Sequence, residues 1–166
     1  MQEAGGSNPP SSTMTGPAGS PPLVVRRLAV GDAAAVAALS EELGYPADAA
    51  GMEARLGAVF ADPGHAVFGA PAEDGSLLGW VHVCDRLLLI DPPSAFVEGL
   101  VVGREARRRG VGRALMAAAE GWAAGRGALT MRLRSAATRA DAHGFYRALG
   151  YSPGREAVGF EKALGG

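Results

Sequence analysis

The chain has 166 residues, of which 48% are hydrophobic and 20% are charged, and its formal net charge is −1 at pH 7. This length and composition suit one globular domain with its own core, and the nearly neutral charge disfavours a nucleic-acid binder. The one cysteine, Cys84, excludes an internal disulfide and is compatible with a reducing compartment. Without a membrane-length apolar run or a signal-peptide pattern, we expect a cytoplasmic protein with no membrane partner.

The N-terminal part of the chain predicts a leader, a strand and two helices. Residues 1–22 are mostly Gly, Ser, Pro and Thr, too poor in large apolar side chains to offset ordering entropy, so we expect a disordered leader before a domain over 23–166. A short strand is expected at Leu23–Leu28. Asp32 suits the N-cap of a first helix that ends at Gly44, and a second helix is expected over roughly Ala49–Phe60.

From His65 the hydrophobic period changes to that of strands, and two further helices follow. The expected elements are strands at 66–68, 77–88 and 96–102, a hairpin turn at 73–76, a helix from 111 to 122, a strand at 129–134, a helix over 139–149, and closing strands at Tyr151 and 158–163. The order β-α-α-β-β-β-α-β-α-β-β predicts a mixed α/β (α+β) fold.

The stretch from Phe96 to Trp122 predicts a buried strand, a basic turn and an amphipathic helix. The strand is apolar on both faces, which suits the middle of a sheet. The first N–H groups of the helix lack intrahelical partners, and the helix dipole attracts an anion to them. Gly110 and Gly112 let a ligand approach the main chain, and five arginines lie within 104–113. We expect a phosphate or pyrophosphate here.

Two motifs resemble those of a known enzyme superfamily. Arg107-x-x-Gly110-x-Gly112, placed after the strand that ends in Leu100-Val101-Val102, closely resembles the acetyl-coenzyme A signature Q/R-x-x-G-x-G/A of the GNAT superfamily of N-acetyltransferases. Residues 142–151 resemble its A-x-x-L/F-Y-x-x-x-G-F/Y helix. The resemblance covers about residues 23–164. It implies a mostly antiparallel sheet flanked by helices, and direct transfer of acetyl from acetyl-CoA to a primary amine of a small molecule or peptide.

The resemblance also implies which residues bind acetyl-CoA. The main chain of the central strand would hydrogen-bond the acetyl carbonyl and the pantetheine arm, and the turn would bind the pyrophosphate. Arg139 replaces an Asn found in many members, and one role open to it is a contact with the 3′-phosphate. The expected coenzyme-binding residues are Leu100, Val101, Val102, Arg107, Arg108, Arg109, Gly110, Val111, Gly112, Arg113 and Arg139.

Glu98 and Tyr146 are the candidates for acid–base chemistry. Glu98 is the only charge within 95–102, where an unpaired buried carboxylate would be costly. It suits a base or an amine-binding group, as proposed for many bacterial members; the alternative is a structural ion pair with an arginine such as Arg132. Gly99 beside it permits a bulge. Tyr146 matches the tyrosine that is taken as general acid in the superfamily, and the alternative is a half-buried core aromatic.

The remaining candidate residues match no motif of the superfamily. One position open to His82 is the acceptor pocket. His143 lies one helical turn from Tyr146, and Cys84 suits the hydrophobic core. Three histidines and one cysteine without ligand spacing predict no metal site. The acceptor is expected at the first two helices and the Gly44-Tyr45-Pro46 loop. Two alternatives stay open: a non-catalytic acetyl-CoA sensor, and a peptide or protein N-terminal acetyltransferase. Homodimers are common among similar folds.

Overall fold

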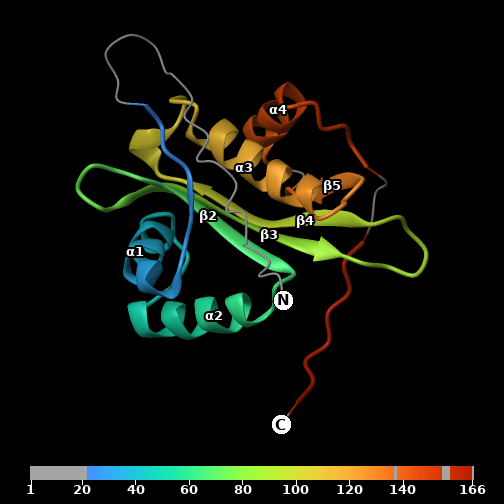
Figure 1. Ribbon diagram of the computed structural model, residues 1–166, viewed down its shortest axis with the longest axis horizontal. Helices are drawn as coiled ribbons and strands as arrows, with labels where there is room; N and C mark the ends of the chain where they lie inside the picture. The colour runs from blue at the N-terminus through green and yellow to red at the C-terminus, as the bar shows by residue number, and fades with distance from the viewer. Residues whose placement is uncertain (1–21, 137, 155–157, 166) are drawn as a thin grey trace, which may run out of the picture. The chain divides into compact units, whose positions relative to one another are not determined.

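The computed structural model describes residues 22–136, 138–154 and 158–165 of the chain, which divides into two compact units, residues 1–134 and 135–166 (Figure 1). Among the described residues, the first unit carries a five-stranded sheet and three α-helices, and the second carries one α-helix. The expected leader, 1–22, lies outside the described residues except for Pro22. The expected domain over 23–166 stays a prediction.

The sheet is mixed and mostly antiparallel, as predicted. Its strands are β1 (Arg26–Arg27), β2 (His65–Pro71), β3 (Leu77–Arg86), β4 (Ser94–Val102) and β5 (Thr130–Leu133), in the spatial order β1-β2-β3-β4-β5. Only β4 and β5 run parallel, because α3 crosses over between them. The strands predicted at 23–28 and 77–88 are shorter than expected.

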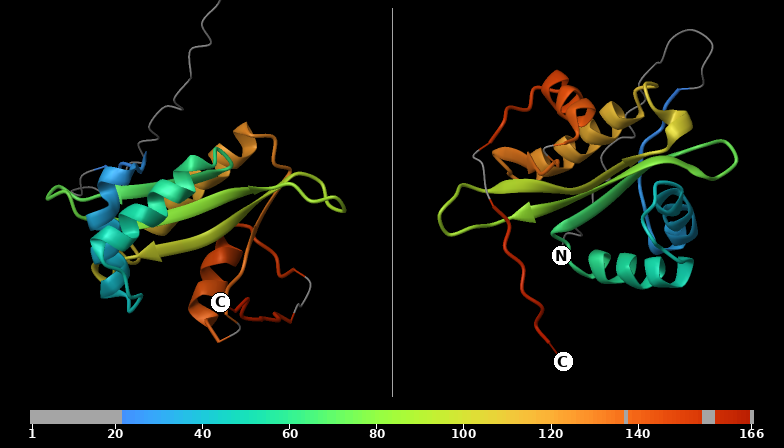
Figure 2. Two further views of the ribbon diagram at one scale, coloured as in Figure 1. Left: turned by 90° about the horizontal axis from the view of Figure 1, so that it is seen from below. Right: turned by 180° about the vertical axis from the view of Figure 1, so that it is seen from behind.

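Helices cover both faces of this sheet. α1 (Ala33–Glu42) and α2 (Ala49–Ala61) lie on one face, and α3 (Val111–Gly125) lies on the other (Figures 1 and 2). Short 3-10 turns at Val30–Asp32 and Arg104–Ala106 precede α1 and α3. Within the described part of the chain, no helix combines the length and apolar character needed to cross a membrane.

Asp32 occupies the predicted N-cap position of α1 but does not cap that helix with its side chain. Its carboxylate instead accepts a hydrogen bond from the N–H of Ala29 at 2.8 Å and pairs with Arg26 at 2.7 Å. The 3-10 turn before α1 explains the difference. The Ala29 N–H at the start of that turn takes the carboxylate of Asp32, which is then not available to the N–H groups of α1.

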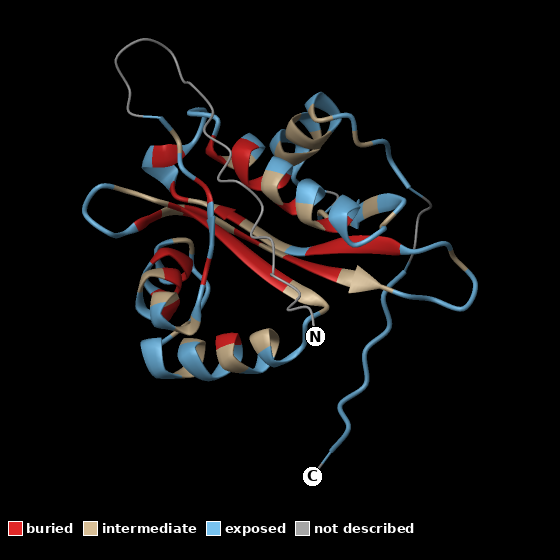
Figure 3. Ribbon diagram, viewed as in Figure 1, coloured by how far each residue is buried: buried red, intermediate tan, exposed pale blue. Residues whose placement is uncertain are grey.

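The core is buried on both sides of β3 (Figure 3). Val67, Trp80 and Val101 pack with residues of α1 and α2 on one face. On the other face, α3 approaches so closely that a Cβ on Gly79 would lie 2.7 Å from the Val101 carbonyl oxygen and 2.9 Å from Leu115 Cδ1. The missing side chain at Gly79 therefore sets the distance between α3 and the sheet.

We expect Gly79→Ala to lower the free energy of unfolding by about 1–3 kcal/mol, because the added methyl group overpacks this contact. Urea denaturation followed by circular dichroism measures the change. Gly121→Ala is the control: it lies on the exposed side of α3 with open space around it, and is expected to leave stability equal or slightly higher. Equal stability of Gly79→Ala and wild type would contradict the close packing.

The second unit contains α4 (Ala140–Ala148), with Arg139 at its N-cap and Leu149 at its C-cap, as predicted. The closing strands predicted at Tyr151 and 158–163 are wrong, because 151–154 and 158–165 have no regular structure. Val158 and Phe160 are 78% and 95% exposed. Their alternation fits a strand, but a strand forms only when a neighbour pairs with it, and no described strand does so here.

Candidate functional site

A β-bulge in β4 places Glu98. Val97 pairs with Val83 and Gly99 with His82, so Glu98 is an extra residue between two paired positions. The bulge that Gly99 permits is therefore present. A Cβ on Gly99 would lie 3.1 Å from the Trp80 ring, so the strand backbone here lies directly against the indole.

Beyond the bulge, β4 loses its neighbour on the β5 side. Pairing between the two strands ends at Val97 and Leu133, which leaves residues 98–102 without a β5 partner. Successive residues of a strand direct their N–H and C=O groups to opposite sides, so about half of those in this segment face the open side. Leu100, Val101 and Val102 lie there, with main-chain groups available to a ligand.

The turn between β4 and α3 holds a row of unpaired N–H groups. In the described part of the chain, no backbone carbonyl accepts from the N–H groups of residues 108–113, and the N–H of Ala114 is the next to bond, to the Gly110 carbonyl at 3.0 Å. Gly110 has φ of 80° and Arg108 has φ of 61°, a region that costs a residue with a side chain about 1 kcal/mol. This backbone therefore stands ready to receive an anion.

The arginines of the same turn add exposed positive charge. None of the five within 104–113 forms an ion pair with a carboxylate among the described residues. All five are solvent-exposed. The turn thus joins N–H donors, the positive end of a 15-residue helix and uncompensated arginines.

Glu98 is held by two neighbours on the sheet. The Cys84 thiol donates a hydrogen bond to Glu98 Oε1 at 3.3 Å, and Arg86 Nη2 lies 3.8 Å from the same oxygen. The alternative of an ion pair with an arginine is therefore met by Arg86 and not by Arg132, which pairs with Asp91 at 2.9 Å. The Glu98 side chain is 39% exposed, so it can reach a ligand in solvent.

Cys84 is a buried thiol that stays protonated at neutral pH. Burial, together with the hydrogen bond to Glu98, raises the pKa of the Cys84 thiol to about 11. The expected core position is confirmed. The sequence analysis did not predict that Cys84 and Arg86 contact Glu98. Both contacts depend on where the bulge shifts the register of β4 against β3.

His82 lies on β3 beside the bulge and contacts a second histidine. Its Nε2 lies 2.9 Å from Nδ1 of His65 on β2, and His65 Nε2 lies 3.8 Å from Oδ2 of Asp62. Burial and the nearby His65 lower the pKa of His82, and the charge of Glu98 partly offsets them. The sequence analysis singled out His82 but not its partner.

Tyr146 and Arg139 belong to the second unit. The Tyr146 ring makes edge contacts with the rings of Phe145 and Tyr151, at centroid distances of 5.2 and 6.0 Å. Burial raises the pKa of the Tyr146 phenol, and the charge of Arg139 partly offsets this. His143 Nε2 lies 2.9 Å from the Ala136 carbonyl oxygen, so its contact is with its own unit's backbone.

Residues 33–151 match the model of the acetyltransferase (GNAT) family. The chain belongs to this family. It is 33% identical over 144 residues to an aminoglycoside N(6')-acetyltransferase type 1 of Stenotrophomonas maltophilia, covering 84% of this chain and 93% of that protein. It is 28% identical over 116 residues to a protein of the same description from Serratia marcescens, covering 68% of this chain and 80% of that one.

Solved structures share the fold. AAC(6')-Iy in complex with CoA superposes with a TM-score of 0.78 at 22% identity, over 88% of this chain and 97% of that one. AAC(6')-Ih from Acinetobacter baumannii gives a TM-score of 0.74 at 20% identity, over 86% and 99%. The chain is therefore a GNAT acyltransferase, an acetyl-CoA-dependent N-acetyltransferase.

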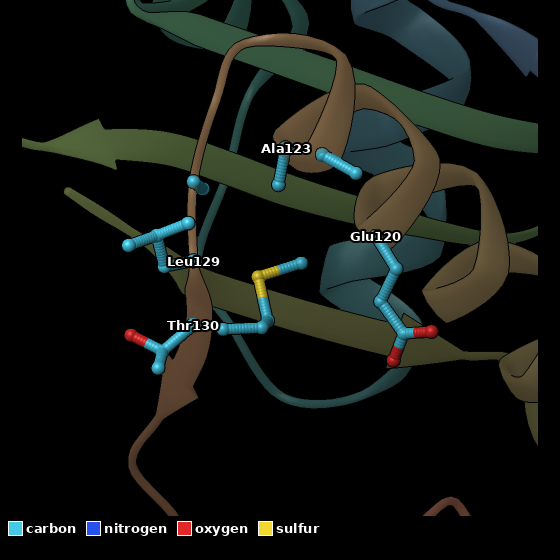
Figure 4. A pocket seen from close by; sticks show the side chains of 7 residues that line it. Glu120, Ala123, Leu129 and Thr130 are labelled. Carbon is cyan, nitrogen blue, oxygen red and sulfur yellow. The ribbon is translucent and has the colours of Figure 1, made fainter.

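A shallow pocket of this GNAT protein lies between the C-terminal end of α3 and β5, and none of the candidate site residues lines it (Figure 4). Its lining is Glu120, Ala123, Ala124, Ala128, Leu129, Thr130 and Met131. It has one acid and no base, which does not suit a phosphate-rich coenzyme. Among the residues that the structure describes, no group of three or more His, Cys, Asp or Glu side chains converges to hold a metal ion.

Proposed function

We propose that the chain transfers the acetyl group of acetyl-CoA to a primary amine of a small polycationic molecule, with the 6'-amine of an aminoglycoside as the first candidate. The observation that carries the proposal is the bulged strand β4: it presents Glu98 and an unpaired main chain directly before a turn of free N–H groups. The similarity to aminoglycoside N(6')-acetyltransferases along 93% of one relative's length supports the acceptor.

The coenzyme would occupy the open side of β4 and the following turn. The N–H groups of residues 108–113 would bind the pyrophosphate. The arginines within 107–113 would add electrostatic attraction to the phosphates, which weakens as the salt concentration rises. The main chain of Leu100–Val102 would bind the pantetheine arm and polarise the acetyl carbonyl. Arg139, whose charge acts on Tyr146, would contact the 3′-phosphate.

The acid–base chemistry falls to Glu98 and Tyr146. The acceptor ammonium binds at Glu98 and loses one proton, and its nitrogen then attacks the thioester carbon. A C–N bond forms, the C–S bond breaks, and Tyr146 protonates the leaving thiolate. The nitrogen gives up a second proton as the amide forms, which restores the Tyr146 phenol. One proton is released to solvent in each turnover.

The charge of the α1–α2 region supports a polycationic acceptor. Residues 41–53 contain four acidic residues and no basic residue: Glu41, Glu42, Asp48 and Glu53. All four are solvent-exposed, and Tyr45 between the two helices is 58% exposed. A negative, aromatic-bearing surface attracts and stacks against cationic sugars.

Two matched acceptors test the proposal: an aminoglycoside with a 6'-amine, and its counterpart with a 6'-hydroxyl. We expect thiol release from acetyl-CoA with the first and not the second, and mass spectrometry of the product should place one acetyl group on the 6'-nitrogen. Spermidine and a short peptide complete the panel. Turnover with the peptide alone would favour the N-terminal acetyltransferase, and coenzyme binding without turnover would favour the sensor.

We expect Gly110→Ala to raise the KM for acetyl-CoA by about tenfold, which corresponds to ~1.4 kcal/mol. The reason is that Gly110 has φ of 80°, and a side chain there would relax the backbone and turn the N–H groups away. Gly127→Ala is the matched control, since Gly127 has φ of 84° at the far end of α3. An equal KM for both variants would contradict the role of the turn.

A further inference from the structure

The histidine pair lies on the same face of the sheet as α1 and α2. His82 is two residues from Trp80, so their side chains share a face, and Trp80 packs against the core under those helices. In β4, the residue opposite His82 is Gly99, directly after the bulged Glu98. An ammonium held by the Glu98 carboxylate would therefore lie close to the His82 imidazole.

The contact between the two rings engages Nε2 of His82, which lies 2.9 Å from Nδ1 of His65. Asp62 Oδ2 lies 3.8 Å from His65 Nε2, beyond hydrogen-bond distance, so it acts on that ring by its charge alone. When His82 Nε2 donates to His65 Nδ1, Nδ1 of His82 keeps its lone pair and can accept a proton.

The surroundings of His82 keep that nitrogen unprotonated at neutral pH. The groups that act on it are His65 from β2, which disfavours its charge, and Glu98 from β4, which favours it; burial outweighs both. Asp62, from the end of α2, faces His65 and also acts on Arg126 of the α3 end. The net effect is an imidazole that is neutral above about pH 6.5, the ordinary His pKa.

We infer that His82 takes the proton from the acceptor ammonium, while Glu98 holds the ammonium by its charge. The inference rests on the proposed function and divides the two roles that the sequence left together at Glu98. An imidazole, with an ordinary pKa of about 6.5, is the side chain best matched to take a proton near neutral pH. Arg86 and the Cys84 thiol hold Glu98 in place for its charge-binding role.

The step balances. One N–H bond of the ammonium breaks, and its proton passes to Nδ1 of His82, directly or through one water. The His82 imidazolium then releases this proton from Nδ1 to solvent, so His82 keeps its Nε2 proton and starts the next turnover in the same tautomer.

The pH dependence of kcat/KM for the acceptor tests the inference. The base must be neutral, and its pKa is lowered, so wild-type activity is present above that pKa and lost as pH falls through a value below about 6.5. The fall in activity at low pH is the acidic limb of this profile. His82→Gln should remove the acidic limb and lower kcat/KM at the high-pH plateau about 10²–10³-fold, with a similar acceptor KM. Glu98→Gln should raise the acceptor KM and keep the limb.

His65→Gln separates a chemical role from a structural one. Because His65 lowers the pKa of His82, its removal should move the limb to higher pH, a shift that loss of packing would not produce. His143→Gln, whose ring contacts the Ala136 carbonyl in the second unit, is the control and should keep the wild-type profile. Calorimetric titration of acetyl-CoA checks that each variant still binds coenzyme.

The outcomes separate the two claims. Wild-type protein that binds acetyl-CoA but acetylates no amine overturns the proposed function. Active wild type with an unchanged limb in His82→Gln and an unshifted limb in His65→Gln overturns the inference alone, and assigns the proton to Glu98.

Discussion

Tyr146→Phe is expected to lower kcat about 10²–10⁴-fold, with the KM for acetyl-CoA within about twofold of wild type. The phenol protonates the leaving thiolate in the proposed mechanism, and its raised pKa keeps the proton on the oxygen throughout the neutral range. Phenylalanine keeps the ring and its edge contacts with Phe145 and Tyr151. Steady-state thiol release measures the effect.

Tyr151→Phe is the matched control for this prediction. It removes a hydroxyl from the neighbouring ring in the same unit, 6.0 Å away between centroids, and should leave kcat within about twofold of wild type. Full activity of Tyr146→Phe would mean that another group, or solvent, protonates the thiolate.

Glu98→Gln is expected to raise the KM for the acceptor amine about 10- to 100-fold, with little change in the KM for acetyl-CoA. The estimate is the loss of a charge-assisted hydrogen bond to an ammonium, about 1.5–3 kcal/mol. The substitution keeps the size of the side chain at the bulge and an oxygen to accept from the Cys84 thiol. Initial rates at varied acceptor concentration measure the effect.

Asp91→Asn is the control for the carboxylate. Asp91 pairs with Arg132 at 2.9 Å on an exposed surface, where an ion pair contributes little, so the acceptor KM should not change. An acceptor KM unchanged in Glu98→Gln as well would show that the amine binds elsewhere.

Much of the fold follows from local signals in the sequence. The hairpin between β2 and β3 lies where the sequence predicts a turn: the Ala72 N–H donates to the Ser76 carbonyl, and the Gly75 N–H donates to the Ala72 carbonyl. Its register does not follow by counting from the turn, because Pro71 pairs with Leu77 whereas Ala70 pairs with Gly79. The pairing that brings His65 next to His82 depends on this shift, which no local signal in the sequence predicts.

The rest depends on tertiary structure. Gly99 permits a bulge, but the sequence does not show that Glu98 is the extra residue, and the partners of Glu98 follow from that position. Likewise, nothing local predicts a positive φ at Arg108, since the surrounding turn imposes it. The alternation in 158–163 predicts a strand, yet pairing with another strand decides whether one forms.

The central claim is that acetyl-CoA gives its acetyl group to an amine on this protein. The most direct measurement is thiol release from acetyl-CoA, with and without a 6'-amino aminoglycoside, by wild type, Tyr146→Phe and Glu98→Gln side by side. We predict amine-dependent release by wild type that falls in both variants, by kcat in the first and by acceptor KM in the second. Release that is independent of the amine, or equal in all three proteins, would contradict the account.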